Sequence, residues 1–143
     1  MKLFLSLFLP AIFLFMLACN NDSDNNDTQS SVARLSYSIA GSYPHDTSSY
    51  TQGLAFYKGQ VFEGTGSYGR SRLMQIDLKT GKAIKQEVLD PKLFGEGITI
   101  LNDTIYQLTW KEKIVLVYSV KDLKKIKEVP LDIEGWGLTN DGK

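Results

Sequence analysis

A short segment occurs three times in the chain, and each copy carries a different side chain in front of the same glycine. The glycines are 44 and then 40 positions apart, which suits the period of a four-stranded propeller blade, about 40–45 residues. Because such repeats stack around one axis, the residues before the glycines are expected at equivalent places, facing one another. The copies are QGLAF at 52–56, EGITI at 96–100 and WGLT at 136–139.

Short apolar or alternating runs separated by turn residues fill the chain between these copies, a pattern typical of antiparallel sheet. Turn-forming pairs occur at matching places, Lys58-Gly59 in the first copy and Asn102-Asp103 in the second. The sequence therefore predicts an all-β fold with four strands per copy. The predicted units are blade one over residues 51–93, blade two over 94–134, the start of blade three over 135–143, and a strand over 34–42 that completes the last blade of a closed ring.

A propeller closes with roughly four to eight blades, and only about two and a half are predicted here. We therefore expect residues 34–143 to be a partial β-propeller from an incomplete gene product or fragment. The sheet edges left without neighbours would make such a piece poorly stable or prone to aggregate. An inactive truncated remnant is accordingly one alternative for its function.

The N-terminal residues have the composition of an export signal. Residues 1–18 combine a basic start, an apolar run and the small residue Ala18 before Cys19; the run is shorter than the roughly 18–20 residues of a spanning helix, which disfavours a retained anchor. MLAC at 16–19 resembles a bacterial lipobox, so Cys19 is a predicted lipidation site, with an unmodified or removed cysteine as the alternative. Residues 19–33 are a predicted disordered tether. We expect an exported, lipid-anchored protein of the bacterial cell envelope, periplasmic or surface-facing.

Charge and residue counts limit the possible partners. The chain has 16 basic and 16 acidic residues, a balance that argues against nucleic-acid binding and limits membrane contact to the lipid anchor. With one histidine and one cysteine no zinc site can be assembled, so we expect no metal and no cofactor. His45, Glu63 and Arg70 are expected to have structural roles.

Several motifs, in order and spacing, together resemble the plant-type and bacterial glutaminyl-peptide cyclotransferases from about Leu35 to the last residue. The resemblance implies a five-bladed propeller, without the catalytic zinc of the animal-type enzyme, that converts N-terminal glutamine of peptides or proteins to pyroglutamate with release of ammonia. It implies an acyltransferase of the aminoacyltransferase type, a monomer when complete. The motifs are YTQGL at 50–54, FEGTGSYGRS at 62–71, FGEGIT at 94–99, YQLTW at 106–110 and GWGL at 135–138.

The same resemblance assigns the site residues. Glu96, in the FGEG motif, corresponds to the catalytic acid/base of the family, and Gln52, Trp110 and Trp136 correspond to residues that line the substrate pocket. Gly64 departs from the serine that is more usual in the family. Three alternatives remain open: a Glu96 that only bonds to backbone at the channel mouth, tryptophans that serve only blade packing, and a non-catalytic cell-surface propeller that binds peptide or glycan.

Overall fold

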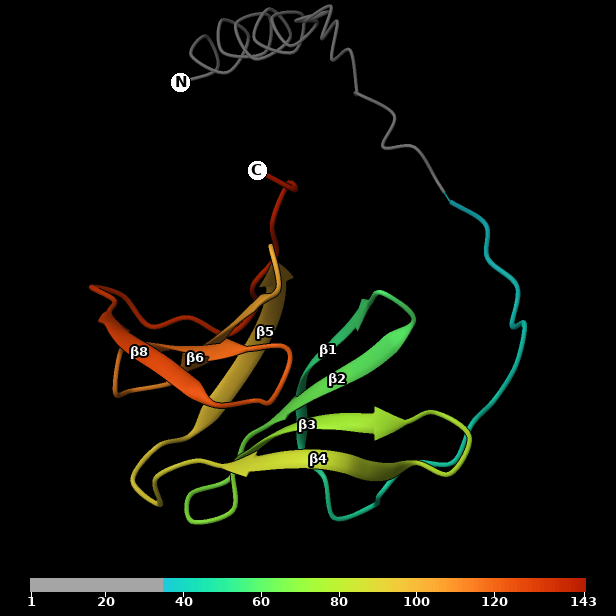
Figure 1. Cartoon of the computed structure of the whole chain (residues 1–143), viewed down its shortest axis with the longest axis horizontal. Helices are drawn as coiled ribbons and strands as arrows, with labels where there is room; N and C mark the ends of the chain where they lie inside the picture. Colours follow the sequence, from blue (N-terminus) through green and yellow to red (C-terminus); the bar gives the residue numbers. More distant parts are fainter. Residues whose placement is uncertain (1–34) are drawn as a thin grey trace, which may run out of the picture. The chain divides into compact units, whose positions relative to one another are not determined.

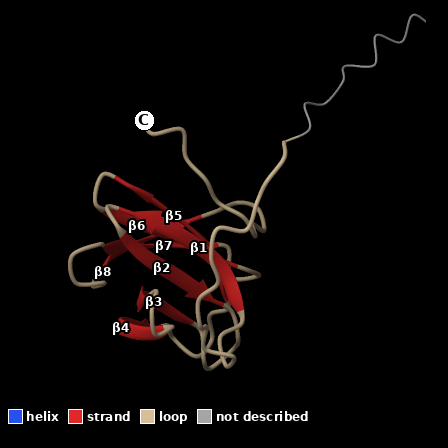
Figure 2. Ribbon diagram, turned by 90° about the vertical axis from the view of Figure 1, so that its right-hand side faces the viewer, coloured by secondary structure: helices blue, strands red, loops and turns tan. Residues whose placement is uncertain are grey.

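The computed structural model describes residues 35–143, which form eight β-strands in two antiparallel four-stranded sheets (Figure 1). The predicted signal peptide, Cys19 and the tether lie outside the described residues. Figure 2 shows strands and loops only, and no helix within residues 35–143 is long and apolar enough to cross a membrane. The prediction of an all-β fold is confirmed.

Each sheet is built from strands that pair with their neighbours in the sequence. The first sheet has the order β1-β2-β3-β4 and the second has the order β5-β6-β7-β8. Each sequence repeat thus folds into one sheet. The strands are β1 (Thr51–Tyr57), β2 (Gln60–Thr65), β3 (Arg72–Asp77), β4 (Lys82–Val88), β5 (Gly95–Leu101), β6 (Thr104–Thr109), β7 (Ile114–Ser119) and β8 (Lys125–Pro130).

The two inner hairpins turn at the residue pairs expected from the sequence. Lys58 and Gly59 between β1 and β2 have φ values of 48° and 76°, and Asn102 and Asp103 between β5 and β6 have 48° and 58°. Two successive positive φ values are the geometry of tight hairpin turns whose twist matches that of the strands. Glycine, asparagine and aspartate tolerate this conformation best, which explains the recurrence of these residues between inner strands.

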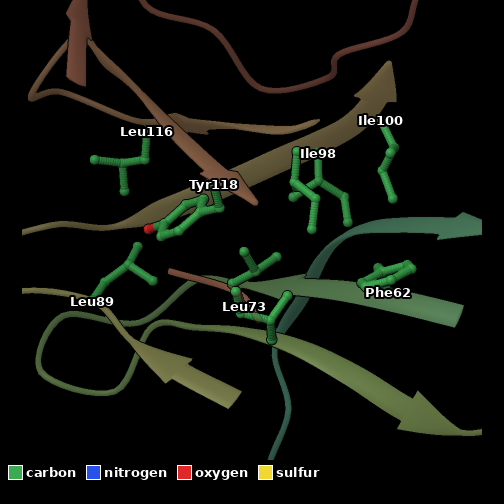
Figure 3. Close-up of a cluster of buried hydrophobic side chains, with 9 residues drawn as sticks. Phe62, Leu73, Leu89, Ile98, Ile100, Leu116 and Tyr118 are labelled. Carbon is green, nitrogen blue, oxygen red and sulfur yellow. The ribbon is translucent and has the colours of Figure 1, made fainter. Parts of the chain in front are cut away.

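The apolar core lies between the two sheets (Figure 3). Phe62 and Leu73 of the first sheet and Ile98 of the second lie in one cluster with Leu116 and Tyr118. All five are at most 5% exposed, so each sheet covers the apolar face of the other. Burial of this kind between neighbours is the main stabilising term in repeat folds.

The outermost strands are protected by their composition. β4 and β8 are exposed along their whole length, and each contains two lysines (Lys82 and Lys85 in β4, Lys125 and Lys127 in β8). Lysine on an edge strand discourages pairing with another chain, because a charge would have to be buried at the new interface.

Residues 35–50, before β1, and residues 131–143, after β8, form no strand. Residues 35–42, where a strand was predicted, have no strand structure, and Leu35, Tyr37 and Ile39 are 92%, 93% and 84% exposed. Residues 131–143 also contain no strand, yet part of this segment lies along β5. The Gly97 N–H donates to the Trp136 carbonyl at 2.8 Å, and the Asn140 amide donates to Thr99 Oγ1 at 2.7 Å.

Candidate functional site

The three repeated glycines lie where neighbouring backbones approach one another most closely. A Cβ atom placed on Gly53 would lie 2.4 Å from the Ile98 nitrogen and 3.0 Å from Gly97 Cα. A Cβ on Gly97 would lie 2.4 Å from the Trp136 oxygen and 3.1 Å from Gly137 Cα. The repeats therefore meet side by side at their glycines, and the residue before each glycine lies at the same contact line.

A β-bulge occurs in both sheets at the position in front of the glycine. In the first sheet the register passes from Thr51 opposite Thr65 to Gly53 opposite Gly64, which leaves Gln52 as the extra residue. In the second sheet it shifts between Gly95 and Ile98, a stretch that contains Glu96. Bulges re-aim a side chain and are over-represented next to active sites. The repeat predicted the position of these residues but not the bulges.

Glu96 is a buried carboxyl group. Its side chain belongs to a residue only 3% exposed, and burial raises the pKa of this carboxyl above its ordinary value because the charged form loses its hydration. Among the described residues no hydrogen-bond donor or cation contacts the Glu96 carboxyl to oppose this effect. A carboxyl with a raised pKa is suited to general acid/base chemistry.

An aromatic cluster lies next to Glu96 in the sequence and connects the two sheets. Phe94 has edge-to-face contacts with Trp110 at 5.6 Å, with Tyr68 at 5.4 Å and with Tyr50 at 6.3 Å between ring centroids. Sequence reasoning assigned only Trp110 to the site. The other three rings stand inside the motifs that carry the family resemblance, and that position is the signal that could have found them.

Trp110 is held in this cluster from several sides. Its backbone N–H donates to the Phe94 carbonyl at 3.1 Å, and the Lys111 ammonium lies 4.3 Å from the centre of its ring. Its indole Nε1 is buried and has no hydrogen-bond partner among the described residues. An unpaired buried N–H costs free energy unless a ligand accepts from it, so this group is a candidate donor to a bound molecule.

The two remaining predicted pocket residues are less enclosed. Gln52 is half-buried on its bulge. Trp136 is 58% exposed, and within residues 35–143 its ring forms no aromatic pair with Trp110. The structure thus brings the Trp136 backbone against β5 but leaves most of its indole open.

Gly64, the departure from the family motif, is explained by its neighbours. A Cβ atom there would lie 2.7 Å from Ile98 Cγ2 and 3.0 Å from Gln107 Nε2, so a side chain at this position would require the side chains of Ile98 and Gln107 to shift. Gln107 itself is fully buried, and neither of its amide atoms has a hydrogen-bond partner among the described residues. The glycine leaves room for Ile98 and for this amide.

His45, Glu63 and Arg70 make the polar contacts expected of structural residues. His45 Nε2 lies 3.0 Å from Glu63 Oε1, and the Arg70 guanidinium contacts Ser67 Oγ at 3.5 Å within the β2–β3 loop. Nowhere in residues 35–143 do three histidine, cysteine, aspartate or glutamate side chains gather in a way that could hold a metal ion.

These features describe an all-β repeat protein with a buried acid in an inner strand and an aromatic cluster formed by loop residues of both sheets. Residues 11–143 match the family model described as glutamine cyclotransferase, and the chain belongs to this family. A glutaminyl-peptide cyclotransferase from Arabidopsis thaliana is 34% identical over 144 residues, which cover 97% of this chain and 45% of that protein. The crystal structure of Myxococcus xanthus glutaminyl cyclase matches with a TM-score of 0.63 and 35% identity over 68% of this chain and 41% of that one. The chain thus spans less than half the length of these relatives.

Proposed function

We propose that this chain is the N-terminal part of a glutaminyl-peptide cyclotransferase, an acyltransferase of the aminoacyltransferase type that converts N-terminal glutamine to pyroglutamate with release of ammonia. The observation that carries the proposal is Glu96, a buried carboxyl on a bulge, two residues after Phe94 of the aromatic cluster, in a chain of this family. In this proposal the enzyme is a five-bladed propeller. The two sheets are its first two blades, and residues 135–143 begin the third.

The chemistry requires proton transfer more than an external nucleophile. The substrate's α-amine attacks the carbonyl carbon of its own side-chain amide, so that a C–N bond forms within a five-membered ring. Glu96 as carboxylate accepts a proton from the attacking nitrogen and, as carboxylic acid, donates it to the departing amide nitrogen, which leaves as ammonia. No water is consumed. General acid/base catalysis of this kind contributes about a hundred to ten thousandfold, and the raised pKa of Glu96 brings it closer to neutral pH.

Other side chains are assigned to the remaining requirements of the reaction. Phe94 and Trp110 provide low-polarity walls for the short glutamine side chain. The unpaired Trp110 Nε1–H is a donor for the oxyanion that develops on the amide carbonyl. Gln52, re-aimed by its bulge, is assigned to orient the amide through its own carboxamide. Trp136 is assigned to the pocket wall from the third blade.

Several properties of the complete protein belong to the same proposal. Its substrates are peptides or proteins with N-terminal glutamine, and it acts as a monomer without nucleic acid. It is exported to the bacterial cell envelope and attached to the membrane through lipidated Cys19 alone. This location would give the enzyme access to exported peptides.

The test uses the complete gene product and a short peptide that begins with glutamine. Mass spectrometry follows the loss of ammonia for the wild type, for Glu96→Gln and for the control Glu128→Gln, which changes a carboxyl on the outer strand β8. We expect activity in the wild type and the control and a loss of about a hundredfold or more in Glu96→Gln. Equal conversion by all three proteins would reject Glu96 as the acid/base, and tight peptide binding without turnover would support a non-catalytic binding protein instead.

A further inference from the structure

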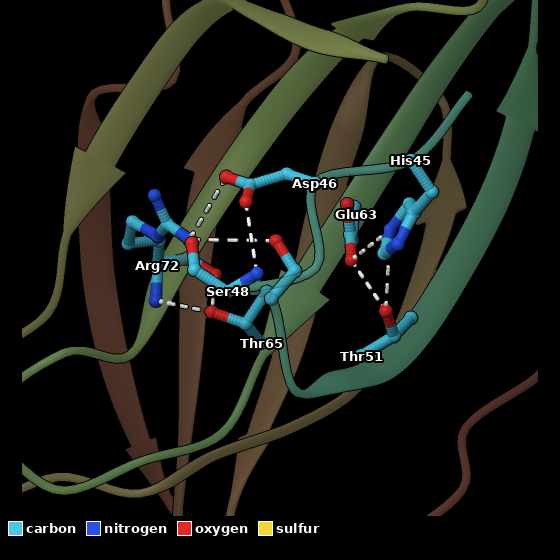
Figure 4. A network of polar contacts seen from close by, with 8 residues as sticks. His45, Asp46, Ser48, Thr51, Glu63, Thr65 and Arg72 are labelled. Carbon is cyan, nitrogen blue, oxygen red and sulfur yellow. Dashed lines mark hydrogen bonds and ion pairs between the residues drawn. The ribbon is translucent and has the colours of Figure 1, made fainter.

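A second buried carboxyl group, Glu63, lies outside the aromatic cluster and has no part in the chemistry above. It stands in the middle of β2 and is 1% exposed. Two groups from other segments converge on its Oε1 atom: the Thr51 hydroxyl donates at 2.5 Å, and His45 Nε2 lies at 3.0 Å (Figure 4). Because a carboxylate oxygen can only accept, the ring hydrogen of His45 is assigned to Nε2.

The geometry excludes a nucleophilic triad for these three residues. In a triad the acid contacts one ring nitrogen of the histidine and the hydroxyl contacts the other. Here His45 Nε2 faces both Glu63 Oε1 and, at 3.5 Å, Thr51 Oγ1. Glu63 therefore serves as a shared acceptor that ties two segments to β2, since hydrogen bonds to a carboxylate are about twice as strong as neutral ones.

One of the two tied segments is the start of the bulge that carries Gln52. Thr51 is the first residue of β1 and pairs with Thr65, and the register then skips Gln52. The hydroxyl of Thr51 is thus fixed to Glu63 immediately before the residue that the bulge re-aims. A bulge leaves its extra residue without ladder hydrogen bonds, so the flanking residues have to hold its direction.

The other tied segment is the loop that leads into β1, which is fastened at several points. Asp46 Oδ2 lies 3.8 Å from the Arg72 guanidinium (Figure 4). Arg72 also donates to Ser49 Oγ at 3.4 Å. The backbone of this loop, at Pro44 and His45, lies against Gly81, where a Cβ would come within 2.5 Å of the Pro44 oxygen. Both segments that contact Glu63 are therefore anchored to the first sheet.

We propose that Glu63, with His45, is a positioning residue that fixes Thr51 and thereby aims the Gln52 carboxamide at the substrate amide. This inference rests on the proposed cyclotransferase function. Glu63 acts through Thr51 and does not touch the substrate. Removing the Thr51–Glu63 bond should weaken substrate binding while the acid/base step at Glu96 stays intact.

The kinetic test compares Thr51→Val, which keeps the branched shape and loses the hydroxyl, with Thr51→Ser, which keeps the hydroxyl. In the complete gene product we expect Thr51→Val to raise KM for a peptide with N-terminal glutamine about tenfold with little change in kcat, because a lost hydrogen bond to a charged group corresponds to about that factor. The KM values of Thr51→Ser and of the control Thr104→Val should stay within about twofold of wild type. Thr104 begins β6 in the second sheet. If Thr51→Val does not fold, His45→Ala, which removes a half-exposed side chain, replaces it in this comparison.

A double-mutant cycle separates positioning from a general structural effect. If Thr51 acts through Gln52, Thr51→Val should add no further loss in a Gln52→Leu background. Losses that multiply in the double variant, or an unchanged KM in Thr51→Val, would overturn the inference.

A readout without turnover keeps the inference distinct from the proposed function. The side-chain amide resonances of Gln52 should shift in Thr51→Val and remain in place in Thr51→Ser and Thr104→Val. Unchanged resonances in all three variants would overturn the positioning role. An inactive wild type with shifted Gln52 resonances would reject the cyclotransferase function as the purpose of this arrangement, while the link from Thr51 to Gln52 would stand.

Discussion

Replacing Gly53 by alanine tests the close approach of the two sheets most directly. The added Cβ would lie 2.4 Å from the Ile98 nitrogen, about 1 Å inside ordinary van der Waals contact, and 3.0 Å from both Gly97 Cα and Ile98 Cγ1. Because the nearest obstacle is backbone, no change of rotamer relieves the overlap and the sheets must move apart. Overpacking of this kind costs about 1–3 kcal/mol, and we expect Gly53→Ala to fall at the upper end, near 3 kcal/mol.

The assay is urea unfolding of residues 20–143, monitored by tryptophan fluorescence. Gly137→Ala is the matched control. Within residues 35–143, no atom other than those of its chain neighbours lies within 4 Å of a Cβ built on Gly137, so that variant should stay within about 0.5 kcal/mol of the parent. With a slope of about 1–3 kcal/mol per molar urea, Gly53→Ala should lower the unfolding midpoint by about 1 M or more. Equal midpoints for the two variants would refute the argument that glycine recurs because the inner strands meet there.

Three further variants probe the buried groups. Glu96→Gln should raise the free energy of unfolding at pH values above the raised pKa of the carboxyl, because the wild type must bury a charge there. The gain should vanish below about pH 4, where the acid is protonated in both the folded and the unfolded state. A gain of the same size at high and at low pH would contradict the assigned cause. Gln107→Met should leave the protein equally stable or up to about 2 kcal/mol more stable in urea unfolding, because neither amide atom has a partner within the described part of the chain. A clear loss of stability would show that the amide is satisfied. Phe94→Leu should cost at least about 1 kcal/mol, since three edge-to-face contacts are lost, and an unchanged urea midpoint would show that the aromatic cluster contributes nothing to stability.

The strands and their order were open to prediction because their signals are local. Alternating apolar residues define a strand within a few positions, and pairs such as Lys58-Gly59 define a hairpin within two. The repeat of the whole pattern then indicates that each copy forms the same unit, as the two sheets do. The motif resemblance likewise predicted the family, which the match over residues 11–143 confirms.

The candidate site was only partly accessible in this way. Gln52 and Glu96 were singled out from their position in front of the glycines, but nothing in the sequence indicated that both lie on bulges. The cluster of Tyr50, Tyr68 and Phe94 also escaped prediction. These aromatic contacts join loops that are far apart in the sequence, and no local pattern records such a distance.

The amino-acid order alone was sufficient for the strand pattern, the turns and the recurrence of glycine, since each depends on backbone preferences over a few residues. Only the folded chain shows that Glu96 and Glu63 are buried and that His45 and Thr51 converge on one oxygen. It also shows that the Gln107 amide has no partner in residues 35–143. The reason is physical: desolvation and hydrogen bonding depend on which atoms surround a group in space. Those neighbours come from segments that are far apart in the sequence. They meet only when one sheet packs against the other and when the loop that leads into β1 packs against β2.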